Sequence, residues 1–498
     1  MATFRTVRGQ EEAKRAATGA VRVALLLMAG GALAVILAAG AKHNKSLRAS
    51  TNATSSTPCN STFDPTHYVV RGSCKTYHKV CFDQGHIVSY DSAFSPSNAT
   101  SLSIPEIKID DMQYAWGGAE DNGDKYRRAY FHYKPLPFRY AGQLEESPDL
   151  QHPVFSDCTP VVMWSMWIHN YGECLSFLAS RMWQMATDGM LSNGTLLSIG
   201  TPAGERLRGF LPFMLQPFTV HPVLSFAELS SRTAAPRENH RSSHPYGRCW
   251  KTAHLCAFHR SDFVAGLFGA GQAIYEHYKT QLREPPPGAV FDTEDEHMLK
   301  VIIDHRNGST RNLLNWQELV HECNSFAGWT LPPNSFIKRV QCRHISLGND
   351  PLINLAAVRP ADVLVAVHGS GCNNWFSMKE GSSLIELRPF QFAKNARDWV
   401  NRYFPAHAGH IKHKVHWYGL DIEDPALSQP SQFEQDHMGA DLKIYARDRH
   451  TTLPFSALRR MLEHVAASGR SRDEYLKLRQ AQQYYFELLP GGELKPVT

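Results

Sequence analysis

The segment 361–389 constrains the fold of this chain more than any other, because it places a loop of small residues between two short, strongly apolar runs. The runs 362–367 and 383–387 each predict a buried parallel strand. The turn between them begins at His368 with the sequence His-Gly-Ser-Gly, whose missing side chains let backbone N–H groups approach an anionic ligand. Ligands of open α/β sheets bind beyond the carboxyl ends of the strands, where this turn would lie. Such a turn can also serve only to connect two strands. The pattern alone therefore leaves open whether the turn binds a ligand or is purely structural.

Length and composition narrow the class of protein. The chain has 498 residues, of which 43% are hydrophobic, so it can form two or three domains with their own cores and is neither disordered nor fibrous. The net charge of +5 is mild, and no Lys/Arg-rich run contains interleaved aromatic residues, so we expect no nucleic-acid partner. The 25 histidines are scattered without H-E-x-x-H or C-x-x-C spacing, which predicts no metal site.

The N-terminal region predicts membrane attachment. Residues 23–41 carry no charge, and as a helix rising about 1.5 Å per residue they would cross a hydrocarbon core of about 30 Å. Five basic residues precede this segment, whereas only three, Lys42, Lys45 and Arg48, follow it closely, which favours a cytoplasmic tail at 1–22 and a lumenal body. We therefore predict a single-pass type II protein of the Golgi or endoplasmic reticulum membrane. A cleaved signal peptide ending near 39–41 is the alternative, and it sends the body to the same side.

Sequons and cysteines agree with a lumenal body. N-glycosylation sequons occur at Asn44, Asn52, Asn60, Asn98, Asn193 and Asn307. The cysteines all follow the apolar segment, at positions 59, 74, 81, 158, 174, 249, 256, 323, 342 and 372, and an even number in a lumenal body permits disulfides. Cys59, Cys74 and Cys81, or Cys249 with Cys256, are close enough for local loops, but spacing does not determine the pairing.

Changes in composition divide the body. Residues 42–65 are rich in Ser, Thr and Asn and predict a stem. We expect an N-terminal α/β domain at 66–285, a Pro-rich break, and a C-terminal α/β domain at 286–425. The remainder, 426–498, predicts closing helices. These helices are expected at 455–467 and 473–488.

Two shorter patterns bear on packing. The run that begins at Pro160 predicts a strand, followed by a polar turn and by apolar residues at helical spacing over 175–185. Gly266, Gly269 and Gly271 form a G-x-x-G-x-G motif without a clear preceding strand. We therefore expect these glycines to allow close helix packing and not to bind a dinucleotide.

An ordered set of residues resembles a known family. A strand ending in Arg306 is followed by Arg311, Asn312 and Asn315, and the loop His368-Gly-Ser-Gly-Cys-Asn-Asn precedes a strand that ends in Glu386 and Pro389. In order and spacing this set resembles glycosyltransferase family 61, which contains plant β-1,2-xylosyltransferase and the animal O-linked GlcNAc transferases acting on EGF repeats and on dystroglycan. The resemblance covers about 161–465 and is best over 300–389. The chain departs from the family at Cys372, where Leu is usual, and at Glu173, where His is common.

The resemblance implies a GT-B-like architecture, in which two Rossmann-like domains face a cleft and the C-terminal domain holds a nucleotide-sugar donor. The residues expected to contact the donor are Arg306, Arg311, Asn315, His368, Gly369, Ser370, Gly371, Asn374 and Glu386. Arg306 and Arg311 would grip the diphosphate together with the N–H groups of 369–371, in which case no metal is obligatory. Glu386 would accept hydrogen bonds from ribose hydroxyls.

The expected activity follows from this resemblance. We expect transfer of xylose, arabinose or GlcNAc from a UDP-sugar to a glycan or glycoprotein in the secretory pathway, with inversion. The acceptor hydroxyl needs a base, for which His169, Glu173 and Asp157 are candidates at a strand-to-helix turn. A glycan on Asn307 would obstruct the donor, so we expect that sequon to be unmodified. A catalytically inactive glycan-binding or scaffolding member is the alternative, whereas a hydrolase is disfavoured because no G-x-S-x-G elbow is present.

Overall fold

The computed structural model describes residues 74–91, 103–113, 127–135, 138–140, 150, 152–165, 170–200, 207, 209–231, 249–258, 266–292, 295–331, 336–394, 403–409, 414–430 and 446–497. The expected tail, membrane anchor and stem at 1–65 and the candidate base His169 lie outside these residues. Among the described residues, no helix is long and apolar enough to cross a membrane. Residues from Cys59 to Thr498 form one compact unit.

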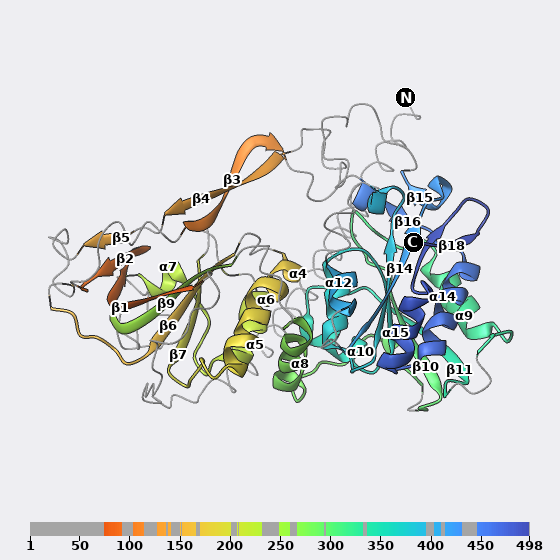
Figure 1. Ribbon diagram of the computed structural model, residues 1–498, viewed down its shortest axis with the longest axis horizontal. Coiled ribbons are helices and arrows are strands. Elements are labelled where there is room, and N and C mark those ends of the chain that lie inside the picture. Colours follow the sequence, from red (N-terminus) through yellow and green to blue (C-terminus); the bar gives the residue numbers. More distant parts are fainter. Residues whose placement is uncertain are drawn as a thin grey trace, which may run out of the picture. The chain divides into compact units, whose positions relative to one another are not determined.

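The described residues form a mixed α/β fold that contains two seven-stranded sheets, and the predicted α/β class is confirmed (Figure 1). Two further pairs of strands are separate, β3 (Ser103–Gln113) with β4 (Arg127–Pro135) and β15 (Ser428–Gln429) with β16 (His450–Thr451).

The sheet nearer the C-terminus, here called the C-terminal sheet, is almost entirely parallel. Its order is β11 (Arg339–Ile345), β10 (Met298–Asp304), β12 (Val363–Val367), β13 (Ser383–Arg388), β14 (His416–Ile422), β17 (Tyr485–Leu488) and β18 (Leu494–Pro496). Only β17 and β18 pair in antiparallel fashion. Strands β10, β12, β13 and β14 are buried along their whole length. β12 is a continuous apolar run, as is typical of a central parallel strand, whereas the other three also bury charged side chains such as Asp304, Glu386 and Asp421. The predicted strands at 362–367 and 383–387 are confirmed as β12 and β13.

The order of these strands creates a switch point. The chain runs from β10 to β11 on one side and then returns, through helix α10 (Pro351–Val358), to β12 on the other side of β10. Connections that leave neighbouring parallel strands in opposite directions open a crevice at the carboxyl ends of those strands. The loops that follow β10 and β12 therefore border the same crevice.

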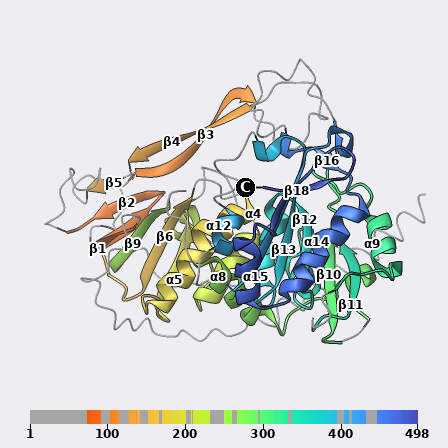
Figure 2. The same ribbon diagram turned by 45° about the vertical axis from the view of Figure 1, so that its right-hand side comes forward.

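Helices accompany the C-terminal sheet. They are α9 (Trp316–Ser325), α10, α12 (Phe404–Gly409), α14 (Phe455–Ser468) and α15 (Arg472–Gln480) (Figure 1, Figure 2). The predicted helix at 455–467 is confirmed as α14. The helix predicted over 473–488 ends at Gln480 instead, because the residues from Tyr485 alternate in burial and join the sheet as β17.

The other sheet, here called the N-terminal sheet, is mixed. Its order is β5 (Phe138–Tyr140), β2 (His86–Ser89), β1 (Cys74–Asp83), β9 (Cys249–Phe258), β6 (Thr159–Ser165), β7 (Thr195–Ile199) and β8 (Leu224–Ser225). Strands β9, β6, β7 and β8 are parallel, whereas β1 is antiparallel to both of its neighbours. From Tyr171 the chain is helical, with α4 (Tyr171–Cys174), a π-helical turn η3 (Leu175–Ala179) and α5 (Ser180–Thr187), so the predicted strand and the helix that follows it are confirmed. Shorter helices α6 (Phe210–Leu215) and α7 (Phe226–Leu229) flank β8.

Disulfides connect strands and helices that are far apart in sequence. The antiparallel register of β1 and β9 places Cys74 opposite Cys256 and Cys81 opposite Cys249, and both pairs are bonded. The local pairings considered from spacing are therefore not the ones formed by these four residues, because strand register decided the partners.

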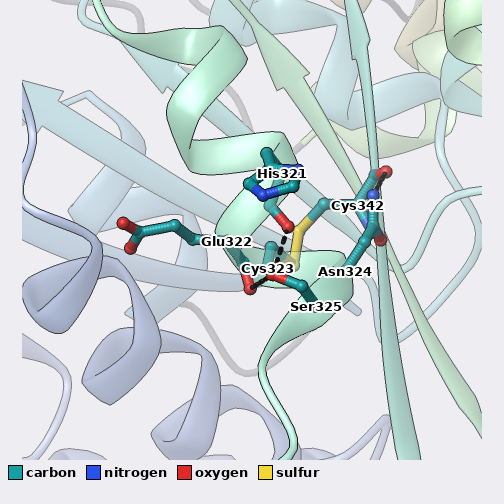
Figure 3. Close-up of a disulfide and its surroundings, with 6 residues drawn as sticks. All are labelled: His321, Glu322, Cys323, Asn324, Ser325 and Cys342. Atoms are coloured by element: carbon teal, nitrogen blue, oxygen red, sulfur yellow. Dashed lines mark hydrogen bonds between the residues drawn. A yellow bond between two sulfur atoms is a disulfide. The ribbon is translucent and has the colours of Figure 1, made fainter.

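A further disulfide joins helix α9 to strand β11. Figure 3 shows the bond between Cys323 and Cys342 and the neighbouring Asn324. The Asn324 amide accepts from the N–H of Cys342 at 2.9 Å and donates to its carbonyl at 3.0 Å. The side chain thus satisfies backbone groups of an edge strand, which would otherwise lack partners.

The glycine motif packs against neighbouring chain segments. Gly266 precedes helix α8 (Leu267–Tyr278), and Gly269 and Gly271 lie within it. A Cβ atom on Gly269 would lie 2.2 Å from the Trp183 ring, and one on Gly271 would lie 2.2 Å from the carbonyl oxygen of Phe376. The expectation of close helix packing is therefore confirmed.

Candidate functional site

A cavity of about 700 Å³ lies at the carboxyl ends of β10, β11 and β12. It is lined after β10 by Asp304, Arg306, Asn307 and Gly308, after β11 by Ser346, Leu347, Gly348, Asn349, Pro351 and Asn354, after β12 by Ser370, Gly371 and Asn374, and from helices α4 and α6 by Asn170, Tyr171, Gly209 and Phe210. Its position is the switch point of the C-terminal sheet, where α/β proteins bind ligands.

Two arginines follow β10 in a compact loop. The N–H of Leu313 donates to the carbonyl of His305 at 3.1 Å, which closes the loop. Arg306 and Arg311 both have positive φ, 49° and 60°, an unfavourable conformation for residues other than glycine. A Cβ atom on Gly369 would lie 2.8 Å from the Nη1 atoms of both arginines. The structure thus brings together the two arginines and the glycine loop that the sequence places far apart, and a side chain at position 369 would displace the ends of both arginines.

The two guanidinium groups are incompletely neutralised. Arg311 is nearly buried, and its Nε lies 3.3 Å from Oδ1 of Asp448. That carboxylate is shared, since it also accepts bonds of 2.8 and 3.0 Å from Arg447. The Arg306 guanidinium has no hydrogen-bond or ion-pair partner in the described part of the chain. Burial, together with the nearby cations Arg447 and Arg306, lowers the pKa of Arg311 to about 9. A bound anion would relieve this excess of positive charge.

Backbone donors face the same region. The 3-10 helix η6 (Ser370–Ser377) begins in the glycine loop, and the first N–H groups of a helix have no partner within it. The N–H groups of Ser370 and Gly371 have no acceptor among the described residues. The Asn374 amide donates to the carbonyl of Gly371 at 2.9 Å and so holds the loop in shape. The loop therefore presents donors beside the arginines, an arrangement suited to phosphate oxygens.

Asp304 is a cavity residue that the sequence interpretation missed. Its Oδ1 accepts from the N–H groups of Arg306 and Leu347, both at 3.1 Å, and so ties the ends of β10 and β11 together. Burial raises the pKa of Asp304. It is the one carboxylate among the described lining residues. An acidic residue at the last position of an apolar strand, two residues before Arg306, was the available signal.

Asn170 is a second residue that the sequence interpretation missed. It caps α4, and its Oδ1 accepts from the N–H groups of Gly172 at 3.0 Å and Glu173 at 3.3 Å. The same oxygen accepts from the Ser370 hydroxyl at 3.0 Å. Asn directly before a short helix is a capping signal, but the contact with Ser370 depends on tertiary structure.

His368 and Glu386 lie behind the glycine loop. Glu386 is fully buried, with one oxygen bonded to Nδ1 of His368. Its other oxygen accepts from Arg388 at 3.0 Å and from the Trp417 indole at 2.7 Å. Burial alone would raise the pKa of Glu386, but Arg388 and the bond from His368 lower it to about 2. Since both oxygens are engaged and the residue does not line the cavity, the expected contact between Glu386 and ribose hydroxyls is corrected to a supporting position.

Asn315 also supports the loop region without lining the cavity. Its amide donates to the carbonyl of Leu453 at 2.9 Å and accepts from the N–H of Leu453 at 3.0 Å. This pair of bonds fixes the chain near the β16 segment, so the expected donor contact of Asn315 is not what the structure shows.

Neither of the two candidate bases within the described residues, Asp157 and Glu173, lines the cavity. Asp157 precedes β6, at the amino end of that strand, and forms a largely exposed ion pair with Lys251. Glu173 lies in the first turn of α4, where helical rotation turns it away from the face that Tyr171 presents to the cavity. The expectation that Asp157 lies at the strand-to-helix turn is wrong, because this residue precedes β6. Ligand sites of α/β sheets form at the carboxyl ends of the strands and not at their amino ends.

Of the expected donor residues, Arg306, Ser370, Gly371 and Asn374 line the cavity, and Arg311 and Gly369 lie directly beside Arg306. The arrangement can bind an anion with two arginine side chains and two backbone N–H groups. No protein-family model matches the chain, and no curated protein matches it in sequence.

Proposed function

We propose that the protein is a glycosyltransferase that binds the diphosphate of a UDP-sugar in the cavity at the carboxyl ends of β10 and β12. The observation that carries the proposal is the Arg306 guanidinium beside the nearly buried Arg311 and the N–H groups of Ser370 and Gly371, since of these groups only Arg311 has a partner among the described residues. A diphosphate has complementary charge and enough acceptor oxygens for both arginines and the backbone. The resemblance to glycosyltransferase family 61 suggests that the transferred sugar is xylose, arabinose or GlcNAc.

The chemistry uses this positive site in a defined way. The acceptor oxygen forms a bond to the anomeric carbon while the bond from that carbon to the diphosphate breaks, and its electron pair stays on the diphosphate. The acceptor proton passes to a base. Arg306 and Arg311 stabilise the charge that develops on the leaving diphosphate, and Asp304 holds the backbone of Arg306 in place. In this proposal no metal is obligatory, because the arginines neutralise the leaving group.

Architecture and compartment belong to the same proposal. A GT-B-like arrangement, with Rossmann-like halves facing a cleft, is supported by the contribution of Asn170, Tyr171 and Phe210 to the lining. A lumenal body on a type II membrane anchor, in the Golgi or endoplasmic reticulum, is supported by the disulfides and by the apolar segment 23–41. The acceptor would then be a glycan or glycoprotein of the secretory pathway.

A thermal-shift titration with UDP, UDP-xylose, UDP-arabinose and UDP-GlcNAc tests the proposal. A ligand that binds only the folded protein raises its melting temperature by mass action. Arg306→Ala removes charge-assisted bonds and should weaken UDP binding about 10- to 100-fold. Arg460→Ala, at an exposed position of α14, is the matched control and should bind like the wild type. The proposal fails if no nucleotide shifts the wild-type protein.

A catalytically inactive glycan-binding or scaffolding protein is the second candidate. It is favoured by one observation, since neither Asp157 nor Glu173 lines the cavity. The two candidates are separated by measuring UDP release from each UDP-sugar in the presence of glycoprotein acceptors. Tight UDP binding without turnover on any acceptor would support the inactive protein.

A further inference from the structure

A buried charged network extends from the glycine loop to the C-terminal strands. Its members are His368, Glu386, Arg388, Asp421 and Tyr485, here called the relay. Arg388 donates to Glu386 at 3.0 Å and to the Tyr485 hydroxyl at 3.1 Å. Its Nη1 lies 3.6 Å from Oδ1 of Asp421, and the Tyr485 hydroxyl donates to the other oxygen of that carboxylate.

Three members of the relay are acidic or basic side chains buried in the core of the sheet. Glu386 and Arg388 are 0% exposed, and Asp421 is 3% exposed. Burying charges costs more free energy than filling the same space with apolar side chains, so stability alone is a poor reason for this arrangement. Buried polar networks instead fix one geometry, because each member is held by directional bonds.

One end of the relay fixes the loop that faces the cavity. His368 directly precedes Gly369, and its ring is bonded to Glu386 and packs against Phe392, with ring centroids 4.8 Å apart. The carbonyl of His368 accepts from Arg311 at 3.5 Å. The orientation of His368 therefore sets both the start of the glycine loop and the position of Arg311, which lies beside the cavity residue Arg306.

The other end lies in strand β17, outside the cavity lining. Tyr485 pairs in register with Gly419 of β14, and the Arg388 guanidinium lies 5.3 Å from the centre of the Tyr485 ring. β17 thereby touches the same arginine that holds Glu386. A change at Tyr485 can reach the loop through Arg388 and Glu386 without contacting a ligand.

We infer that Tyr485, Arg388 and Glu386 are positioning residues for the anion site, through which the C-terminal strand β17 sets the affinity of the glycine loop for a diphosphate. This inference rests on the proposed function for the identity of the ligand. It gives a role to β17, a strand that does not line the cavity.

Isothermal titration calorimetry of the full-length protein with UDP, which measures the Kd, tests the inference. Tyr485→Phe removes the hydroxyl bonds but keeps the ring, and Glu386→Gln keeps the shape but removes the charge. We expect the Kd for UDP to rise about 3- to 10-fold in the first variant and about 10- to 30-fold in the second. Tyr484→Phe is the matched control, since the hydroxyl of Tyr484 has no hydrogen-bond partner in the described part of the chain, and its Kd should equal that of the wild type.

Parallel measurements separate positioning from folding. If the variants only destabilise the fold, the melting temperature and the binding stoichiometry fall while the Kd of the folded fraction stays unchanged, and the inference is overturned. Inorganic pyrophosphate is titrated alongside UDP. A wild-type protein that binds pyrophosphate but not UDP removes the UDP-sugar proposal, and the same variants then test positioning with pyrophosphate. Failure of the wild type to bind either probe overturns both proposals.

Discussion

Single residues in the cavity combine unfavourable backbone geometry with unneutralised charge. Arg306 and Arg311 both adopt positive φ, which costs a non-glycine residue about 1 kcal/mol or more. Such residues persist where the surrounding structure holds them, here through bonds to Asp304 and Asp448. The residue types were visible in the sequence. The lack of a counter-ion for Arg306 among the described residues was not visible, because it depends on where distant acidic residues lie.

Two exposed sequons give a residue-scale prediction about glycosylation. Asn307 lines the cavity, whereas Asn193 is exposed in the turn before β7 and is not among the lining residues. We expect Asn193 to carry a glycan and Asn307 to be unmodified, since a glycan on Asn307 would fill the entrance to the anion site. Glycopeptide mass spectrometry of the secretory-pathway protein measures both positions. An occupied Asn307 in protein that binds UDP would contradict the placement of this loop in the site.

A buried histidine gives a prediction about acid stability. Burial, reinforced by Arg472, lowers the pKa of His416 to about 3, and neither ring nitrogen has a hydrogen-bond partner among the described residues. The unfolded chain binds a proton near pH 6.5, so the stability linked to neutral His416 is present above that pH and is lost as the pH falls toward 3. His416→Phe keeps the stacking on Tyr475 but cannot bind a proton. The free energy of unfolding of this variant, relative to that of the wild type, should therefore rise by about 2 kcal/mol when the pH falls from 7.5 to 5.0. Urea unfolding of both proteins at both pH values measures these free energies. The same difference between variant and wild type at the two pH values would refute the prediction.

At the scale of elements, the contact between α8 and η6 connects the segment after β9 to the glycine loop. Gln272 donates to the carbonyls of Phe376 and Met378 at 2.9 and 2.8 Å, and its own oxygen accepts from Arg359 at 2.7 Å. Gly271 allows this approach, because its backbone lies against Phe376. The spacing of the glycines indicated close packing, but only the fold showed that the partner is the helix carrying the candidate site.

Gly271→Ala should destabilise the protein by about 1 to 3 kcal/mol. The added Cβ would lie 2.2 Å from a backbone oxygen that cannot rotate away, so that α8 or η6 must shift. Gly308→Ala is the control, since a Cβ there meets nothing within 4 Å, and it should change stability by less than about 1 kcal/mol. Urea unfolding without ligand measures both. Equal midpoints for the two variants would show that the helix contact is not tight.

At the scale of the whole molecule, two disulfides close nearly the same large loop. Cys74–Cys256 and Cys81–Cys249 have sequence separations of 182 and 168 and join the same pair of strands. With either bond intact the large loop remains closed, and the other bond closes only a short ring. Their stabilising effects on the unfolded chain are therefore coupled.

Serine substitutions of these cysteine pairs should be more than additive. Removing either pair should cost about 3 kcal/mol, and removing both should cost about 8 kcal/mol, because only the double change opens the large loop in the unfolded state. Replacing Cys323 and Cys342, with a separation of 19, is the control and should cost about 3 kcal/mol independently of the other two. Denaturant unfolding of the four variants measures these values. Strict additivity would show that unfolded-state entropy is not the cause.

The sequence by itself determined the local elements whose signals are strong. Short, strongly apolar runs predicted β12 and β13, and apolar residues at helical spacing predicted α5 and α14. The glycine motif predicted the close packing of α8. These features depend on neighbours within a few residues, so periodicity and small side chains suffice to predict them. The meeting of the arginines with the glycine loop was expected only through resemblance.

Tertiary structure alone decided which polar groups face the cavity. Glu386 is engaged by Arg388 and Trp417, Asn315 binds Leu453, and Asp304 emerges as the lining carboxylate. The cysteine partners and the switch point between β10 and β12 were likewise set by strand order and register. The physical reason is that charge neutralisation and hydrogen bonding depend on distances between residues far apart in the chain, which no local pattern encodes.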